Sequence, residues 1–276
     1  MKYPGGLGAA TIAAMRDVAE TYILPRYKKL ADDDVRTKTG PTDLVTVADI
    51  ESEHALTPIL SGLLPGSKVI GEEAASADAG VLRHLAGDDP VWIIDPIDGT
   101  ANFVNGSARF AVMIALVRRG ETLMGWIHDP VANRTLWAEK GAGAWLEEGS
   151  SLTRVRQPPL ASNNLSDMNA GLYDREMGDL KGKFARVMRL GSAAHDYWSL
   201  TDGRLQVLSF RRLKPWDHAA GTLIHQEAGG YNCMRSGLPY APAQKDQVSI
   251  LCAPNRHIWD VVINALGAAQ ARGAKT

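Results

Sequence analysis

Cysteine is scarce in this chain, with Cys233 and Cys252 the only two among 276 residues. Two thiols can form at most one bridge, which excludes a secreted disulfide framework and favours a reducing compartment. We therefore expect both thiols to be buried and apolar. The length excludes a disulfide-stapled miniprotein, because a chain of this size can bury a substantial core of its own.

A strong net charge and a long apolar run are missing as well. Thirty Lys and Arg nearly cancel thirty-one Asp and Glu, so a net charge of -1 creates no field that attracts nucleic acid or an anionic membrane. No stretch approaches the roughly 20 apolar residues that cross a bilayer. Residues 1–20 carry a Pro-Gly-Gly break and charges where a signal peptide needs an unbroken apolar region. We expect a cytoplasmic protein that binds neither membranes nor nucleic acid.

The composition is that of a folded globular protein with two differently patterned halves. Hydrophobic residues make up 45% and charged residues 22%, which excludes a mainly disordered or collagen-like chain. Residues 1–150 combine amphipathic helices with short apolar strands joined by turns, a pattern that predicts an antiparallel sheet. Residues 151–276 alternate strands and helices and predict an α/β half. Residues 149–166, rich in Ser, Pro, Asn and Thr, form the expected boundary.

Two predicted strands run directly into acidic residues. One leads into Gly-Glu-Glu at 71–73, and the other into Asp-Pro-Ile-Asp-Gly-Thr at 95–100. A single turn acid is usually solvated or caps a helix, so Gly-Glu-Glu alone is a weak signal. A capped strand-to-helix turn explains Asp98 but leaves Asp95 without a role. The pair therefore indicates chemistry as well as local structure.

A divalent cation gives both carboxylates a role. If residues 98–100 open a helix, its first N–H groups form an anion site, but a phosphate fits there only when positive charge cancels the carboxylates. The acidic turns contain no Cys or His. Oxygen ligands favour a hard cation, Mg²⁺ first with Mn²⁺ or Ca²⁺ as competitors, over zinc. The residues predict phosphoryl transfer to water.

Five segments, in this order along the chain, resemble the inositol monophosphatase family of Mg²⁺-dependent, lithium-sensitive sugar and nucleotide phosphatases. They are residues 43–49, 71–73, 92–100, 191–194 and 216–221. The resemblance covers nearly the whole chain. It implies a layered α-β-α-β-α sandwich with an antiparallel N-terminal sheet, an α/β C-terminal half and an active site where the halves meet. It also implies a homodimer.

The resemblance assigns metal ligands position by position. Glu72, Asp95 and the carbonyl of Ile97 match ligands of a first metal. Asp95, Asp98 and Asp217 match ligands of a second, which stabilises the leaving alkoxide in the family. A third, weaker site again uses Glu72, so two or three Mg²⁺ ions are expected, with Mn²⁺ as a substitute.

The same resemblance assigns roles in catalysis and substrate binding. Three residues match the group that polarises the attacking water: Asp49, Glu72 and Thr100. The implied mechanism is in-line attack by metal-activated water without a covalent phosphoenzyme. Lys38 precedes Asp49 at the family's spacing and is expected over the site. Five residues are expected from the resemblance to contact substrate: Asp98, Gly99, Thr100, Ala193 and Asp217. Arg211 is expected as a sixth contact because of its charge, and not because of the resemblance.

Two positions depart from the pattern of inositol-specific members. Phe210 stands where those members carry a Glu that binds a ring hydroxyl, and Gln206 stands where an Asp is usual. Because an apolar ring cannot accept a hydrogen bond as a carboxylate does, a preference for inositol monophosphate is in question. The nearby basic residues Arg211, Arg212 and Lys214 form either a solvated face or a contact for a second anionic group.

The expected function is Mg²⁺-dependent hydrolysis of a small polyol, sugar or nucleotide phosphomonoester, as by an inositol-1-monophosphatase. A 3'(2'),5'-bisphosphate nucleotidase, a fructose-1,6-bisphosphatase and a histidinol phosphatase stay open as alternatives. A regulatory protein that binds the transcription machinery is the alternative from another class, because some bacterial relatives act in that way.

Overall fold

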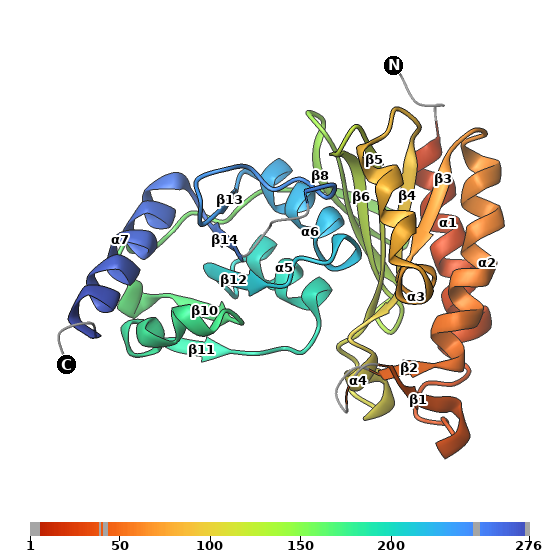
Figure 1. Cartoon of the computed structure of the whole chain (residues 1–276), viewed down its shortest axis with the longest axis horizontal. Coiled ribbons are helices and arrows are strands. Elements are labelled where there is room, and N and C mark those ends of the chain that lie inside the picture. Colours follow the sequence, from red (N-terminus) through yellow and green to blue (C-terminus); the bar gives the residue numbers. More distant parts are fainter. Residues whose placement is uncertain (1–5, 39, 41–43, 245–248, 274–276) are drawn as a thin grey trace.

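Helices and sheets alternate in five layers in the computed structural model (Figure 1). The parts of the chain that it describes are residues 6–38, 40, 44–244 and 249–273. Helices α1 (Leu7–Val18) and α2 (Val47–Leu63) cover the outer face of a seven-stranded sheet. Helices α5 (Ala193–Thr201) and α6 (Pro215–Glu227) lie between this sheet and a five-stranded sheet, whose far face is covered by α7 (Arg256–Gly273). The α-β-α-β-α sandwich is confirmed.

The seven-stranded sheet is a meander with one parallel strand at its edge. In spatial order its strands are β3 (Lys68–Gly71), β4 (Val91–Asp98), β5 (Ala111–Arg118), β6 (Glu121–Asp129), β7 (Arg134–Glu139), β8 (Gly143–Glu148) and β9 (Ser151–Val155). Strands β4 to β9 pair antiparallel, as the sequence predicts, whereas β3 runs parallel to β4. Because β9 belongs to this sheet, the sheet continues past residue 150, and a division of the chain there stays a prediction.

The five-stranded sheet is mixed. Its spatial order is β11 (Arg186–Met188), β10 (Asn169–Leu172), β12 (Val207–Arg211), β14 (Ser249–Ala253) and β13 (Tyr231–Met234). Strand β10 is parallel to both of its neighbours, and β14 is antiparallel to β12 and β13. Helices α5 and α6 come before and after β12 in the chain, which agrees with the predicted alternation of the second half.

Apolar side chains form a separate core in each space between layers. Successive residues of a strand point to opposite faces, so Trp92 and Ile94 of β4 pack toward α1 and α2, whereas Ile93 packs toward α5 and α6. All of β4 is buried, as expected for a strand covered on both faces. Cys252 lies in the middle core and Cys233 in the core under α7, both as buried free thiols. The expectation for the cysteines is confirmed.

Short elements complete the fold. They are η1 (Ala19–Ile23), η2 (Asp32–Asp34), the paired strands β1 (Val35–Thr37) and β2 (Leu44–Thr46), α3 (Glu72–Ala77), η3 (Ala79–Ala86), α4 (Thr100–Val104), η4 (Leu165–Asp167) and η5 (Arg175–Lys183). Within the described residues, no helix is both long enough and apolar enough to cross a membrane. Asp43, the first residue of the predicted motif at 43–49, lies outside the described residues.

Candidate active site

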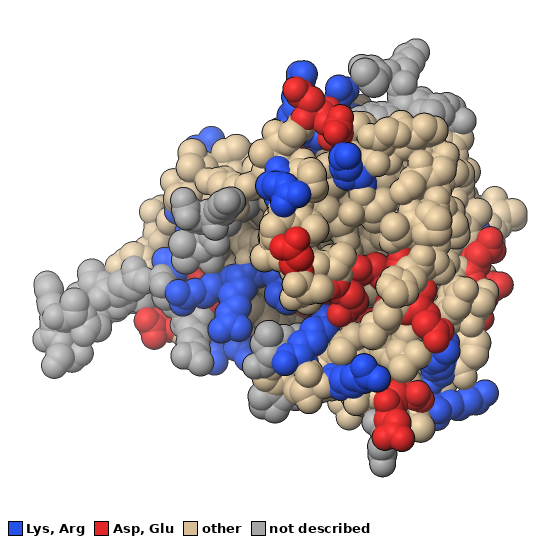
Figure 2. Space-filling view, turned by 45° about the vertical axis from the view of Figure 1, so that its right-hand side comes forward, with Lys and Arg blue, Asp and Glu red and all other residues tan. Residues whose placement is uncertain are grey.

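The predicted acidic residues meet where strands β3 and β4 end, beside the first turn of α6. Parallel pairing aligns Gly71 of β3 with Ile94 of β4, which sets Glu72 beside Asp95. Asp217 reaches the same place from the first turn of α6. Burial raises the pKa of Asp95 well above its usual value, and the charges of Glu72, Asp98 and Asp217 raise it further. On the face shown in Figure 2, Asp and Glu side chains form a band beside several Lys and Arg side chains.

A bulge at the end of β4 turns the backbone toward the site. The pairing of β4 with β5 shifts register between Asp95 and Asp98. Gly99 follows in the left-handed region, with a φ of 86°. A Cβ there would lie 2.8 Å from the Arg109 carbonyl oxygen and 3.0 Å from the Ser192 Cβ, so only glycine fits without displacing the backbone.

Asp49 and Thr100, predicted as a pair, are in contact. Asp49 caps the start of α2, where its Oδ2 accepts hydrogen bonds from the Thr46 N–H at 2.8 Å and the Thr46 hydroxyl at 2.6 Å. The Thr100 Oγ1 lies 3.2 Å from Asp49 Oδ1 and 3.0 Å from the Ile97 carbonyl oxygen. Burial raises the pKa of Asp49 to about 7, although the bonds from Thr46 oppose the shift. A group with this pKa exchanges protons readily near neutral pH.

Asp98 is held by the start of α5. Its Oδ1 accepts a hydrogen bond from the Ala193 N–H at 3.0 Å, and its Oδ2 accepts from the Ala194 N–H at 2.9 Å and from the Ser192 hydroxyl. Burial raises the pKa of Asp98 to about 6 against the effect of these bonds. Ala193, predicted to touch substrate, therefore contacts Asp98 through its backbone. The bonds join the second half of the chain to β4.

A histidine that the sequence analysis did not single out extends the hydrogen-bonded contact between Asp98 and the start of α5. The proton of the Ser192 hydroxyl goes to Asp98, so the serine oxygen accepts from His195, whose Nδ1 lies 3.1 Å away. On the other side of the ring, Nε2 lies 4.0 Å from Asp129 Oδ2. Burial lowers the pKa of His195 to about 4, so the ring is neutral at pH 7. Ser192 and His195 thus position Asp98 without adding positive charge.

Two lysines face the acidic residues that follow β3. The Lys38 Nζ lies 3.0 Å from Glu72 Oε1 and 2.6 Å from Glu73 Oε1. Burial acts to lower the pKa of Lys38, but the two carboxylates outweigh it and hold the pKa above its usual value. The Lys214 Nζ lies 3.8 Å from the same Glu72 oxygen. Glu72 is therefore partly neutralised by the chain itself.

Glu53 is a second residue that the sequence analysis missed. Its buried carboxylate accepts hydrogen bonds from the backbone N–H groups of Glu73 and Ala74, at 2.8 and 2.9 Å, and so caps α3. A Cβ at Gly71 would lie 1.9 Å from the Glu53 Cδ, so a larger residue there would displace the Glu53 carboxylate from these hydrogen bonds. The available signal was helical spacing, since Asp49 and Glu53 continue the buried stripe of Leu56 on α2. Glu53 fixes the direction in which Glu72 leaves β3.

The donor set suits a hard divalent cation. Among the residues that the structure describes, no group of three or more His, Cys, Asp or Glu side chains is arranged as a formed metal site. Asp95 Oδ1 is nevertheless buried and has no hydrogen-bond partner within the described part of the chain, a costly state for a carboxylate oxygen unless a cation binds it. The residues that would hold a cation are those of the sequence prediction: Glu72, Asp95, Asp98, Asp217 and the carbonyl of Ile97.

The residues that depart from the inositol-specific pattern have structural contacts. Phe210 stacks on Tyr173 with ring centres 5.0 Å apart and lies 4.7 Å from the His218 ring. Gln206 accepts a hydrogen bond from the Asn169 N–H at 2.8 Å, which links two parts of the second sheet. Arg211 lies exposed at the end of β12, and its predicted contact with substrate stays a prediction.

Asp196 gives a test of the electrostatics close to the site. It is fully buried on α5, and burial raises its pKa from an ordinary 3.8 to about 8. The folded chain therefore keeps a proton that the unfolded chain releases, so this residue lowers stability progressively as pH rises from about 4 to 8. We expect Asp196→Asn to raise the free energy of unfolding at pH 7 by on the order of 2–4 kcal/mol. Urea unfolding at several pH values should show the difference vanish near pH 4; a gain that is independent of pH would contradict this account.

Comparison with known proteins identifies the family. The family model described as "Inositol monophosphatase family" matches residues 7–271. The chain belongs to this family. A Thermotoga maritima protein named fructose-1,6-bisphosphatase/inositol-1-monophosphatase is 36% identical over 206 residues, covering 72% of this chain and 74% of that protein. A Vibrio cholerae protein named Nus factor SuhB is 34% identical over 233 residues, covering 78% and 84% of the two chains.

The solved structures agree with the fold. The structure of the Thermotoga maritima IMPase matches with a TM-score of 0.77 at 28% identity, covering 95% of this chain and 97% of that one. The sequence-based recognition and the fold class are confirmed. So is the enzyme class, because the family is one of phosphoric monoester hydrolases. The chain is an inositol monophosphatase family phosphatase, while the roles of its individual residues stay predictions.

Proposed function

We propose that the protein is a Mg²⁺-dependent phosphomonoesterase that hydrolyses a small polyol, sugar or nucleotide phosphate. The observation that carries the proposal is the buried carboxylate cluster, in which Asp95 Oδ1 has no hydrogen-bond partner among the described residues and neighbouring acids raise the pKa of Asp95. Such a cluster requires positive charge, and a phosphate ester requires the same charge in order to approach. Family membership supports the same chemistry.

The site's own residues supply orientation and a route for a proton. When bound among Glu72, Asp95, Asp98 and Asp217, a divalent cation supplies the charge that neutralises the carboxylates and attracts the phosphate. The turn at Gly99 presents backbone N–H groups to phosphate oxygens. Water attacks phosphorus in line with the departing alcohol, so that one P–O bond forms as the other breaks, without a phosphoenzyme. The water proton passes to Thr100 Oγ1, whose own proton moves to Asp49 Oδ1, 3.2 Å away. The departing alkoxide takes a proton from solvent, and Asp49 afterwards returns its proton to solvent.

A phosphate-release panel tests the proposal. The purified protein is assayed with inositol 1-phosphate, fructose 1,6-bisphosphate, histidinol phosphate and nucleotides, with Mg²⁺, with Mn²⁺ and with a chelator. We expect release that requires the divalent cation and that Li⁺ inhibits by competing at a cation site. If no ester is hydrolysed under any of these conditions, the proposed activity is wrong.

A protein partner is the second candidate function, favoured by the relative named Nus factor SuhB. We propose that the protein works in the cytoplasm as a homodimer and that any such partner binds outside the carboxylate cluster. Capture from host lysate is compared between wild type and Asp95→Asn. A transcription protein retained by both forms would support the separate role, and the absence of any such protein would contradict it.

A further inference from the structure

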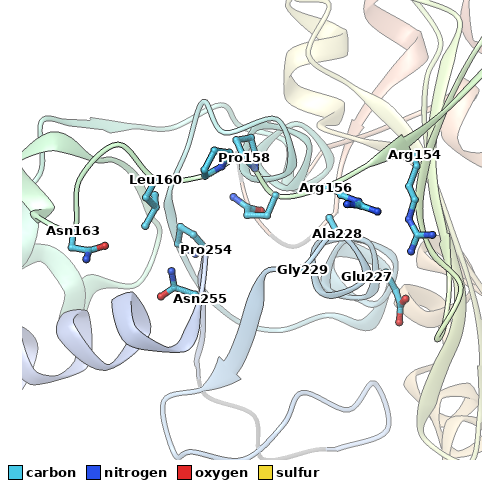
Figure 3. Close-up of a pocket in the computed structure, with 12 residues that line it drawn as sticks. Arg154, Arg156, Pro158, Leu160, Asn163, Glu227, Ala228, Gly229, Pro254 and Asn255 are labelled. Atoms are coloured by element: carbon cyan, nitrogen blue, oxygen red, sulfur yellow. The ribbon is translucent and has the colours of Figure 1, made fainter.

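A cavity of about 520 Å³ lies beside the segment that connects the two sheets (Figure 3). It is bounded by the end of β9, the connecting segment 156–163, the end of α6 and the residues that precede α7. We call it the linker pocket. Its volume lies within the range of roughly 300–1,000 Å³ that is usual for small-molecule sites.

The linker pocket is separate from the carboxylate cluster. Glu227 lines the pocket at the end of α6, whereas Asp217 lies in the first turn of the same helix. Ten residues of helix separate the two by about 15 Å, too far for one small ligand to occupy both places. A ligand of this pocket is therefore additional to the phosphate ester.

The connecting segment is held against the helices, so it forms a defined wall of the pocket. The Gln157 N–H donates to the Ala228 carbonyl oxygen at 2.6 Å, and its side-chain Nε2 donates to the Leu200 carbonyl oxygen at 3.1 Å. Pro158 packs on Gly203, where a Cβ would lie 2.9 Å from the Pro158 Cγ. A ligand in the linker pocket thus meets a wall whose backbone is bonded in place.

Two cations of the pocket have no carboxylate partner. Arg154 and Arg156 line it, and neither forms an ion pair with a residue that the structure describes. The Arg154 guanidinium lies 5.5 Å from the centre of the Trp145 ring, which directs it along β9 and β8. In Figure 3 the guanidinium groups of Arg154 and Arg156 lie at the end of the pocket nearest the seven-stranded sheet.

Glu227 does not balance these two charges. It is the one acidic residue among the described residues of the lining, and backbone N–H groups already bind its carboxylate. Gly141 donates to Oε1 at 2.8 Å, and Gly143 donates to Oε2 at 2.9 Å. Two guanidinium groups thus face one carboxylate that is directed at the turn between β7 and β8. The excess positive charge favours an anionic ligand.

Amide donors lie at the other end of the pocket. Asn255 precedes α7, and its Oδ1 accepts a hydrogen bond from the Ile258 N–H at 3.0 Å. This bond leaves the amide Nδ2 as a donor, and no residue in the described part of the chain accepts from it. Figure 3 shows the amides of Asn163 and Asn255 away from the two guanidinium groups. Both ends of the pocket therefore offer donors to a ligand.

The walls between the two ends are largely apolar. Pro158, Leu160 and Pro254 contribute to them. An inorganic anion would contact the guanidinium groups and leave most of the 520 Å³ without partners. A ligand with an anionic group and an apolar body matches the whole pocket, because the body removes the proline and leucine surfaces from water.

We propose that the linker pocket binds a small organic phosphate as a second ligand of this protein. The phosphate lies between Arg154 and Arg156, because its several oxygens and double negative charge suit two guanidinium groups better than a single carboxylate does. The organic body packs on the prolines and Leu160, and an acceptor on it receives the Asn255 amide. The bound molecule connects β9, α6 and α7 and so stabilises the packing of the two halves.

Binding to metal-free protein tests this proposal. The protein is freed of divalent cations on a chelating resin, so that the uncompensated carboxylate cluster repels anions. The probe is phenylphosphonate in mildly alkaline buffer, a dianion whose C–P bond a phosphomonoesterase does not hydrolyse. Calorimetry should show saturable binding at one site per chain, and a thermal scan should show a higher Tm with the probe. Benzyl alcohol, which carries the same ring without the anion, should not bind.

Three variants locate the binding site. Arg156→Gln removes one guanidinium and should weaken phenylphosphonate binding by about 10- to 100-fold. Asn255→Asp keeps an oxygen that can cap α7 but replaces the amide donor by a negative charge, and it should weaken binding by at least about tenfold. Arg186→Gln is the matched control, because Arg186 is an exposed arginine of β11 outside the lining. It should leave the affinity within about twofold of wild type.

Each outcome decides for or against the site. Binding that Arg156→Gln and Asn255→Asp weaken and Arg186→Gln preserves supports it. No saturable binding up to about 10 mM, or the same loss in all three variants, contradicts it. If benzoate binds as tightly as phenylphosphonate, the assignment of a phosphate is wrong, and if inorganic phosphate does, the assignment of an organic body is wrong. Because the experiment needs neither metal nor turnover, it stands even if the proposed phosphatase activity fails.

Discussion

Asp95→Asn is expected to reduce kcat for phosphate release by at least about a thousandfold at saturating Mg²⁺. Asp95 is 2% exposed, and none of the residues that the structure describes forms a hydrogen bond with its Oδ1. Asparagine keeps the shape of the side chain but removes its charge and one of its two oxygens. The remaining amide is a much weaker donor to a hard cation than a carboxylate is. Phosphate release at increasing Mg²⁺ concentrations measures the loss.

A thermal-unfolding measurement distinguishes the expected loss of kcat in Asp95→Asn from misfolding of the variant. Mg²⁺ should raise the Tm of the wild type, because a ligand that binds only the folded state stabilises it. Asp95→Asn should keep or raise the Tm without Mg²⁺, since it removes a buried charge, and should lose the rise with Mg²⁺. Asp196→Asn is the matched control, because it replaces another buried carboxyl group outside the predicted ligand set. Full activity in Asp95→Asn would refute the ligand assignment.

Thr100→Val is expected to lower kcat by about a hundredfold or more with little change in KM. Valine nearly matches threonine in shape and lacks only the hydroxyl, which lies between Asp49 Oδ1 and the Ile97 carbonyl oxygen. Without that hydroxyl the attacking water has no proton route to Asp49. Thr100→Ser retains the group and should recover most of the rate.

Steady-state kinetics of Thr100→Val and Thr100→Ser test whether the Thr100 hydroxyl transfers the proton. Loss confined to kcat in the valine variant, with recovery in the serine variant, supports transfer of the proton through the hydroxyl. An equal loss in both variants would instead assign Thr100 a packing role at the turn that follows Gly99. A valine variant as active as the wild type would remove Thr100 from the predicted catalytic group.

Local patterns in the sequence predict the main parts of this protein. Buried strands show as apolar runs, and the acids that end them stand out because carboxylates are rare next to such runs. The resemblance of five ordered segments to one family extends these patterns to a fold, which is confirmed. The same patterns place Asp95 and Asp98 together, since only two residues separate them. The amphipathic helices and the antiparallel meander are likewise properties of short segments.

Contacts between distant segments are decided only by the tertiary structure. Parallel pairing of β3 with β4 sets Glu72 beside Asp95, and nothing within either segment specifies that pairing. Glu53 shows in the sequence only as a polar residue on the buried stripe of α2, and its role depends on the approach of α3. Likewise, His195 meets Asp129 only because α5 packs against the seven-stranded sheet. The cavity between η3 and the turn from β12 to α6 likewise joins segments more than a hundred residues apart.

This difference between what the sequence predicts and what the tertiary structure decides has a physical reason. Hydrophobic periodicity and turn residues act through the dihedral angles and burial of neighbouring residues. A short segment of sequence is therefore enough to reveal a helix, a strand or a turn. The depth of a cavity, the partner of a buried carboxylate and the direction of a guanidinium depend on how whole layers pack. The sequence by itself therefore determined the family, the layers and the acids of this phosphatase. Only the packed structure decided what holds those acids in place.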